Sequence, residues 1–409
     1  MTSIFDTIDT FLEASRPRAE AFLAELVKVP SDNPKGDCAP LAARTKELLE
    51  DLGLPVEVDL VPASVVQANG MVSASNLIVR RKFGDGPTIA LNAHGDVVPP
   101  GEGWTKDPYG AEVVDGVMYG RGVAVSKSDF ATYTFALLAL QEVAGNIAGT
   151  VELHFTYDEE AGGEIGPKRL LETGLSRPDL AIGAGFAYSV VTAHNGCLHL
   201  GVELLGRSAH AARPDTGFDA LEAANGVLTA LYASRKSLQT RRSKVKGIEA
   251  PTLVVGLISG GINTNVVPDR VLLRLDRRMI PEEVPDDVEA ELRRLIESAA
   301  QKYPGISVRI RRILLARPLT QLPGATKLIE ALVAQATEVM GIQVASAGIP
   351  LYTDGRHYAE AGVPCVLYGA GPRDLLEANA HRADEKLVLA DLHAATRVVA
   401  RSLASLLIR

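Results

Sequence analysis

The sequence has few of the residues on which several protein classes depend. Among its 409 residues are three widely spaced cysteines, Cys38, Cys197 and Cys365. So few cysteines exclude a disulfide framework and argue against a thiolate zinc site. We therefore expect three small, buried side chains in a protein of a reducing compartment, the cytoplasm. The N-terminal segment carries acidic residues and lacks a basic stretch followed by an apolar core, so it does not resemble a signal peptide.

Long apolar runs and excess positive charge are also missing. No run is long enough to span a bilayer. The formal net charge of -8 argues against an electrostatic surface for nucleic acid, so we expect neither a nucleic-acid nor a membrane partner. The hydrophobic content of 46% is that of an ordinary globular protein, and the length suffices for two domains.

The stretch 88–129 contains the most informative pattern in the sequence. Thr88–Leu91 is an apolar run between turn residues, which predicts a buried strand. His94 and Asp96 follow at its end, spaced to share one side of an extended chain. A loop rich in proline and glycine leads to a Gly-Arg-Gly step and an apolar helix pattern over 130–143. A strand end beside a long loop is a favourable place for chemistry.

A second strand, predicted over 150–157, ends in Asp158-Glu159-Glu160 followed by Ala-Gly-Gly. Neighbouring residues on a strand face opposite ways, but glycines provide a bend that brings both glutamates to one place. An isolated acidic turn is usually only solvated. Here the turn follows a strand, as His94 does, and that favours a functional interpretation.

The order of elements indicates two domains. Strands alternate with helices up to about residue 195, which is typical of an α/β domain, and the pattern resumes after 315. Between them, residues 196–314 read strand, helix, strand, strand, helix, strand, which is the split-βαβ order. We therefore expect a domain made of 1–195 and 315–409, with an inserted domain over 196–314.

Several motifs together resemble the M20 family of metallopeptidases and deacylases. They are HGDVVPPGEGWTKDPYGAEVVDGVMYGRG from His94, GRSAH to His210, NVVPD from Asn265, TDGR to Arg356, and AHRADE around His381. The family includes acetylornithine deacetylases, succinyl-diaminopimelate desuccinylases, aminoacylases and glutamate carboxypeptidases. The resemblance implies an α/β fold, with a mixed-sheet catalytic domain of zinc-exopeptidase type and an inserted ferredoxin-like domain that makes a homodimer.

The resemblance also implies roles for individual residues. Glu159 would be the general base, and His210 would reach the partner subunit's site to stabilise an oxyanion. Two His and one carboxylate are a workable metal set. The expected sets are catalytic Glu159, Asp96 and His210; substrate-binding Asn265, Arg278 and Arg356; and metal-binding His94, Glu160 and His381.

Two positions depart from the family pattern. Where the family has an aspartate bridging two metal ions, two residues before Lys127, this chain has Val125. Where the family usually has a third carboxylate ligand, the corresponding position in this chain falls at about Gly185. Two dications roughly 3.5–4 Å apart repel by on the order of 20 kcal/mol at an effective dielectric of about 20. Because the bridging carboxylate is missing, we expect each chain to bind at most one divalent ion, with zinc as the first candidate, or none.

We therefore predict an amidohydrolase with a reduced metal centre. Its substrate would be small and carry a carboxylate, such as an N-acyl amino acid or a short peptide. Two alternatives stay open. One is a metal-independent enzyme on this scaffold that uses Glu159 with His94 and Asp96. The other is a non-catalytic protein that binds a small molecule in the same cleft.

Overall fold

The computed structural model describes residues 3–409, which form two compact units. The larger unit contains the residues up to Thr192, 321–347 and 353–409. The inserted unit contains 193–320 and 348–352. The inserted domain expected over 196–314 lies within this second unit, which extends further at both ends and takes up a short segment from later in the chain.

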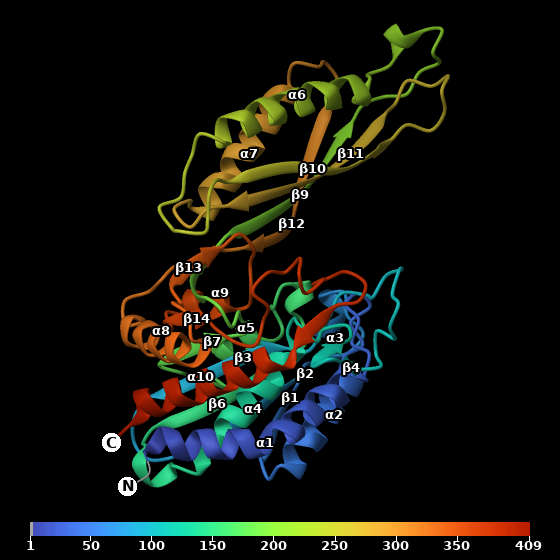
Figure 1. Cartoon of the computed structure of the whole chain (residues 1–409). Helices are drawn as coiled ribbons and strands as arrows, with labels where there is room; N and C mark the ends of the chain where they lie inside the picture. Colours follow the sequence, from blue (N-terminus) through green and yellow to red (C-terminus); the bar gives the residue numbers. More distant parts are fainter. Residues whose placement is uncertain (1–2) are drawn as a thin grey trace. The chain divides into compact units, whose positions relative to one another are not determined.

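The larger unit contains an eight-stranded sheet in which parallel and antiparallel pairs mix (Figure 1). β3, β6, β7 and β14 run parallel to one another. β2 pairs with β6 in antiparallel orientation, and β1 pairs with β2 in the same way. This agrees with the predicted α/β class. In spatial order the strands are β1 (Val56–Leu60), β2 (Ser75–Lys82), β6 (Thr150–Thr156), β3 (Thr88–His94), β7 (Leu180–Gly183), β14 (Cys365–Leu367), β8 (Val190–His194) and β13 (Ser346–Ile349).

Three long helices, α1 (Ile4–Val27), α4 (Lys127–Gln141) and α10 (Leu389–Leu407), pack side by side, with α4 against β3 and β6 (Figure 1). α4 is buried along almost its whole length, so its apolar pattern shows no polar face. Proline is tolerated in the first turn of a helix, so the sequence predicts that the helix over 4–28 breaks at Pro17, with Ser15 capping a second segment; the structure shows that this prediction is wrong. Pro17 lies on the exposed side of one continuous helix, where water can reach the carbonyl that its ring leaves unbonded. Within residues 3–409, no helix is both long and apolar enough to cross a membrane.

The larger unit also contains further α-helices and a second, three-stranded sheet. They are the helices α2 (Ala39–Asp51), α3 (Ala63–Ala68), α5 (Pro167–Glu172), α8 (Thr326–Met340) and α9 (Gly355–Glu360), and the three-stranded sheet of β4 (Glu112–Val114), β5 (Val117–Tyr119) and β15 (Lys386–Val388).

The inserted unit has the element order that the sequence predicted. Its antiparallel sheet has the strand order β10-β11-β9-β12, and α6 and α7 cover one face of it (Figure 1). Alternate residues of β9 and β11 meet these helices in a second core. The elements are β9 (Gly196–Leu205), α6 (Ala220–Leu238), β10 (Thr252–Gly260), β11 (Arg270–Met279), α7 (Pro285–Ala300) and β12 (Ser307–Ala316).

Candidate active site

The carboxyl ends of parallel strands meet at one edge of the large sheet. β3 ends at His94 and β6 at Thr156, and these two residues lie opposite each other in the register. β7 ends beside them at Gly183, and β14 runs parallel to β7. The polar segments that follow β3 and β6 are therefore brought together, at the edge where α/β sheets usually bind ligands.

Asp96 is the centre of the hydrogen bonds at this edge, and it is completely buried. Its Oδ1 accepts the backbone N–H of Glu159 at 3.1 Å, and its Oδ2 accepts that of Glu160 at 3.0 Å. The Asn33 amide also donates to Oδ2, and His94 Nδ1 lies 3.3 Å from Oδ1. Because both oxygens are engaged within the protein, Asp96 is a positioning residue that orients His94 and the acidic turn. The catalytic role of Asp96 stays a prediction, and these contacts show how its carboxylate is held.

The acidic turn is a short 3₁₀ segment, Glu159–Ala161. Gly162 and Gly163 follow it with φ of 110° and 68°, so the glycines supply the bend that the sequence predicted. Burial raises the pKa of Glu159 to about 8 and that of Glu160 to about 7, although nearby His94 opposes both shifts. Both carboxyl groups therefore take up and release protons near neutral pH.

His94 lies almost fully buried among these acids. Burial alone would lower its pKa, but the hydrogen bond that His94 donates to Asp96 and the charge of Glu159 raise that pKa well above its usual value. This shift favours the charged imidazole, whose charge opposes that of the neighbouring carboxylates.

His381 approaches the acidic turn from a loop late in the chain. Its Nε2 lies 3.5 Å from Glu160 Oε1, and its backbone has a left-handed φ of 62°. The loop is anchored by Glu385, whose Oε2 lies 2.5 Å from Arg121 Nη1, with both side chains buried. This ion pair ties the Gly-Arg-Gly segment to the segment that carries His381.

The three predicted metal ligands do not form one close group in the structure. Glu160 and His381 lie close together, but His94, Glu160 and His381 do not all lie within 4.8 Å of one another. Val125 is part-exposed and its side chain has no donor atom. A side chain at Gly185 would have its Cβ 2.5 Å from the backbone nitrogen of Tyr368, so a carboxylate cannot stand there without a backbone shift.

Two buried acids, Asp129 and Asp354, were not among the predicted site residues. Asp129 lies in the first turn of α4 and accepts the backbone N–H groups of Ala370 at 2.6 Å and Gly185 at 3.1 Å. It therefore joins the ends of β7 and β14. Asp354 is buried with no hydrogen-bond partner at Oδ2, and burial raises its pKa well above the usual value. The sequence signal that could have identified Asp129 was its position directly before the apolar run at 130–143.

The inserted unit carries three of the predicted residues. His210 is exposed, and its Nδ1 accepts the N–H of Ala212 at 3.0 Å. The N–H of Ala211 donates to the Asn265 carbonyl at 3.0 Å, so His210 and Asn265 lie on adjoining segments. Arg278 pairs with Asp276 at 3.0 Å and stands over the ring of Tyr352, which belongs to the same unit.

Arg356, the third predicted substrate-binding residue, lies buried in the larger unit. It is 2% exposed, and its guanidinium donates to the carbonyl of Gly162, beneath the acidic turn. His357 Nε2 contacts the same carbonyl at 3.1 Å. Arg356 therefore contacts the backbone of the acidic turn, and its contact with substrate stays a prediction.

The three cysteines are free and buried, as predicted. One of them, Cys197, lies in a group of side chains whose spacing would allow a metal ion, so the prediction of no thiolate zinc site stays open for it. Within residues 3–409, a single group of three His, Cys, Asp or Glu side chains has ligand atoms that all lie within 4.8 Å of one another: Cys197, His199 and Asp276. The residues are up to 79 positions apart in the chain, so no short spacing motif predicts the group.

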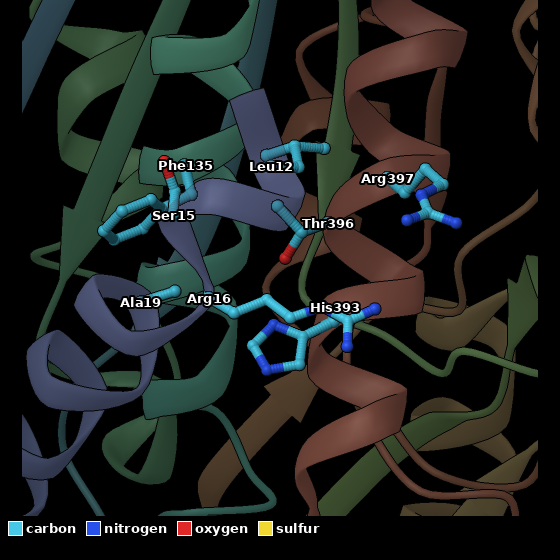
Figure 2. Close-up of a pocket in the computed structure, with 8 residues that line it drawn as sticks. All are labelled: Leu12, Ser15, Arg16, Ala19, Phe135, His393, Thr396 and Arg397. Carbon is cyan, nitrogen blue, oxygen red and sulfur yellow. The ribbon is translucent and has the colours of Figure 1, made fainter. Parts of the chain in front are cut away.

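A small cavity between α1, α4 and α10 does not compete with the sheet edge as a substrate site (Figure 2). Its volume of about 10 Å³ has room for about one water molecule. Figure 2 shows its lining residues, which are Leu12, Ser15, Arg16, Ala19, Phe135, His393, Thr396 and Arg397.

Comparisons with known proteins agree with this geometry. The profile of peptidase family M20/M25/M40 matches residues 90–405. An acetylornithine deacetylase of Pectobacterium carotovorum is 32% identical over 259 residues, which are 62% of this chain and 64% of that enzyme, slightly under two thirds of its length. A succinyl-diaminopimelate desuccinylase of Wolinella succinogenes is 27% identical over 402 residues, 95% of this chain and all of that enzyme. An M20 metallo-carboxypeptidase of Sulfolobus solfataricus has a similar fold, with a TM-score of 0.76 and 18% identity over 94% of this chain and 98% of that one.

Proposed function

Because this chain belongs to peptidase family M20/M25/M40, whose members hydrolyse amide bonds, we propose that it cleaves the amide of a small substrate that bears a carboxylate. An N-acyl amino acid or a short peptide is the expected class, in line with the deacylases among its relatives. The observation that carries the proposal is the acidic turn, in which Asp96 holds Glu159 and Glu160 through their backbone N–H groups.

Glu159 is the proposed general base. It takes a proton from water as the water oxygen adds to the amide carbon, and it returns that proton to the nitrogen as the C–N bond breaks. Asp96 does not compete for the proton, because both of its oxygens already accept hydrogen bonds. Positioned acid–base groups of this kind contribute about 10²–10⁴-fold to the rate.

Glu160 and His381 are the proposed ligands of one divalent ion, zinc first, with His94 as a third candidate. The distance of 3.5 Å between Glu160 Oε1 and His381 Nε2 suits two ligands of one ion. We propose one ion rather than two because Val125 and Gly185 stand where the family usually has carboxylate ligands. When bound, such an ion polarises the substrate carbonyl and makes the attacking water more acidic. His94 needs a small shift to join, because the three ligand atoms are not all within 4.8 Å.

The inserted unit is proposed to complete the site in a homodimer. His210 is exposed and next to Asn265, so both can be presented to a second subunit. There His210 would donate to the developing oxyanion, a contribution of about 3–4 kcal/mol for a well-aimed donor. Asn265 and Arg278 would bind polar groups of the substrate, with the forked guanidinium suited to a carboxylate. A cytoplasmic location, which the three free cysteines favour, is part of the same proposal.

A metal-independent enzyme remains the second candidate. The specific observation in its favour is the buried imidazole of His94, which Asp96 and Glu159 hold in its charged form and which can serve as the local cation. In this mechanism His94 would stabilise negative charge on the substrate, and Glu159 would keep its role as the base.

The proposal is tested by measuring amine release from a panel of N-acyl amino acids and dipeptides. We expect turnover of at least one of them, and Glu159→Gln should lower kcat by about 10²–10⁴-fold while leaving substrate binding intact. Glu164→Gln is the matched control, because Glu164 pairs with Lys168 on the next turn and should keep normal kcat. Substrate binding without hydrolysis by the unmodified protein would instead identify a binding protein, and equal kcat in Glu159→Gln would refute the assigned base.

A further inference from the structure

Cys197, His199 and Asp276 share one face of the inserted sheet. Cys197 and His199 are two apart on β9, so their side chains point the same way. In the antiparallel register Asp276 of β11 lies directly opposite His199, and Arg278 lies opposite Cys197. The intervening Leu198 and its neighbours on β11 face the helices in the core. The pairing of β9 with β11 thus brings together residues that the chain keeps far apart.

The distances in this cluster are those of metal ligands. Cys197 Sγ lies 3.2 Å from His199 Nε2, His199 Nε2 lies 3.1 Å from Asp276 Oδ2, and Cys197 Sγ lies 4.0 Å from Asp276 Oδ1. Zinc bonds of about 2.3 Å to sulfur and about 2.0–2.1 Å to nitrogen or oxygen put tetrahedral ligand atoms roughly 3.3–3.6 Å apart. Shifts of a few tenths of an ångström would therefore seat an ion.

Hydrogen bonds also connect these groups, since the thiol donates to Asp276 Oδ1 and the imidazole contacts Asp276 Oδ2. The thiol and the carboxylate both approach the same imidazole nitrogen, and one N–H can point well at only one of them. A cation between the three atoms satisfies all of them together. Thiolate, imidazole and carboxylate form a donor set that suits zinc and disfavours magnesium or calcium.

The surroundings are compatible with a bound cation. Arg278 Nε donates to Asp276 Oδ1 at 3.0 Å, the type of outer contact that commonly orients a ligating carboxylate. His199 and Asp276 are each about one-third exposed, so an ion can reach the cluster from solvent, while Cys197 is buried beneath.

We propose that Cys197, His199 and Asp276 bind one thiophilic divalent cation of the zinc type, at a site within the inserted unit that is independent of the acidic turn. Three protein ligands leave a fourth position for water or another small donor. The ion would join β9 to β11 beside Arg278. This site is additional to any metal ion held by Glu160 and His381, and neither site requires the other.

Cobalt titration of the metal-free full chain tests the proposal, because a thiolate–cobalt bond gives an intense near-ultraviolet band and the acidic turn offers no sulfur ligand. We expect the band to saturate at one equivalent per chain and to disappear when zinc is added. Cys197→Ser should abolish the band. His199→Asn should weaken cobalt binding by at least about 100-fold, since even the outer partners of metal ligands are worth about 10–100-fold.

The controls separate this site from the rest of the chain. Cys38→Ser and Cys365→Ser remove the other two buried thiols and should keep the band. His381→Ala should keep it too, because that residue belongs to the other proposed site. If Cys197→Ser fails to fold, the part-exposed His199→Asn variant decides the question. No thiolate band in the unmodified protein, or an unchanged band in His199→Asn, would overturn the proposal and leave an ordinary ion-pair network.

Discussion

The ion pair between Arg121 and Glu385 should be among the costliest contacts to break in the larger unit. Both side chains are 1% exposed, and the charged atoms are 2.5 Å apart. Glu385 Oε1 also accepts the N–H of Ala124 at 3.0 Å, and Arg121 donates to two backbone carbonyls. Removing one partner of such a buried pair costs about 3–5 kcal/mol, because the other charge is left uncompensated.

A double-mutant cycle measures this. Arg121→Met and Glu385→Gln should each lower the free energy of unfolding by about 3–5 kcal/mol, and the double variant should cost about the same as one of them. Urea unfolding can be followed through Trp104, the single tryptophan, whose ring lies under the Arg121 guanidinium at 5.2 Å. Lys82→Met, in the exposed pair with Asp85, is the control and should leave the unfolding midpoint unchanged. Single-variant costs below about 1 kcal/mol, or simple additivity, would refute the reasoning.

Three further predictions concern the site. Val125→Asp should raise metal affinity and amide hydrolysis by a modest factor; untouched native activity in chelator, together with loss of activity in Val125→Asp, would instead favour the metal-independent mechanism. Mixed dimers of Glu159→Gln and His210→Ala should recover part of the activity after subunit exchange, and no recovery despite proven exchange would contradict a shared site. Burial raises the pKa of Asp129 from 3.8 to about 7 in the folded protein. The free energy of unfolding of the wild type, relative to that of Asp129→Asn, should therefore fall by up to about 4 kcal/mol as pH rises from about 4 to about 7. A difference in urea unfolding that does not change with pH would contradict this prediction.

The sequence predicted those features that depend on short-range patterns. The buried strand before His94, the acidic turn with its two glycines, and the βαββαβ order of the insert all follow from local periodicity and turn residues, and the structure has them. The meeting of His94 with Glu159 also followed, because parallel strands bring their carboxyl ends to one edge.

Features set by tertiary contacts were not predictable in the same way. Arg356 looked like a substrate-binding arginine, yet its carbonyl partner, Gly162, lies 194 residues away. Cys197 and Asp276 are joined only by the register of β9 and β11, which a single sequence does not reveal. The continuity of α1 depended on which side of the helix Pro17 faces. Burial and register, which decide these cases, are properties of the folded chain.

The most direct test of a reduced metal centre is a count of the metal ions that the acidic turn and His381 retain. The count should be made on the Cys197→Ser variant, purified without chelator and dialysed, so that the proposed site in the inserted unit does not contribute. Because Val125 supplies no bridging carboxylate, two neighbouring dications would repel strongly. Elemental analysis should therefore give at most one divalent ion per chain, and two ions per chain that survive dialysis would contradict the account.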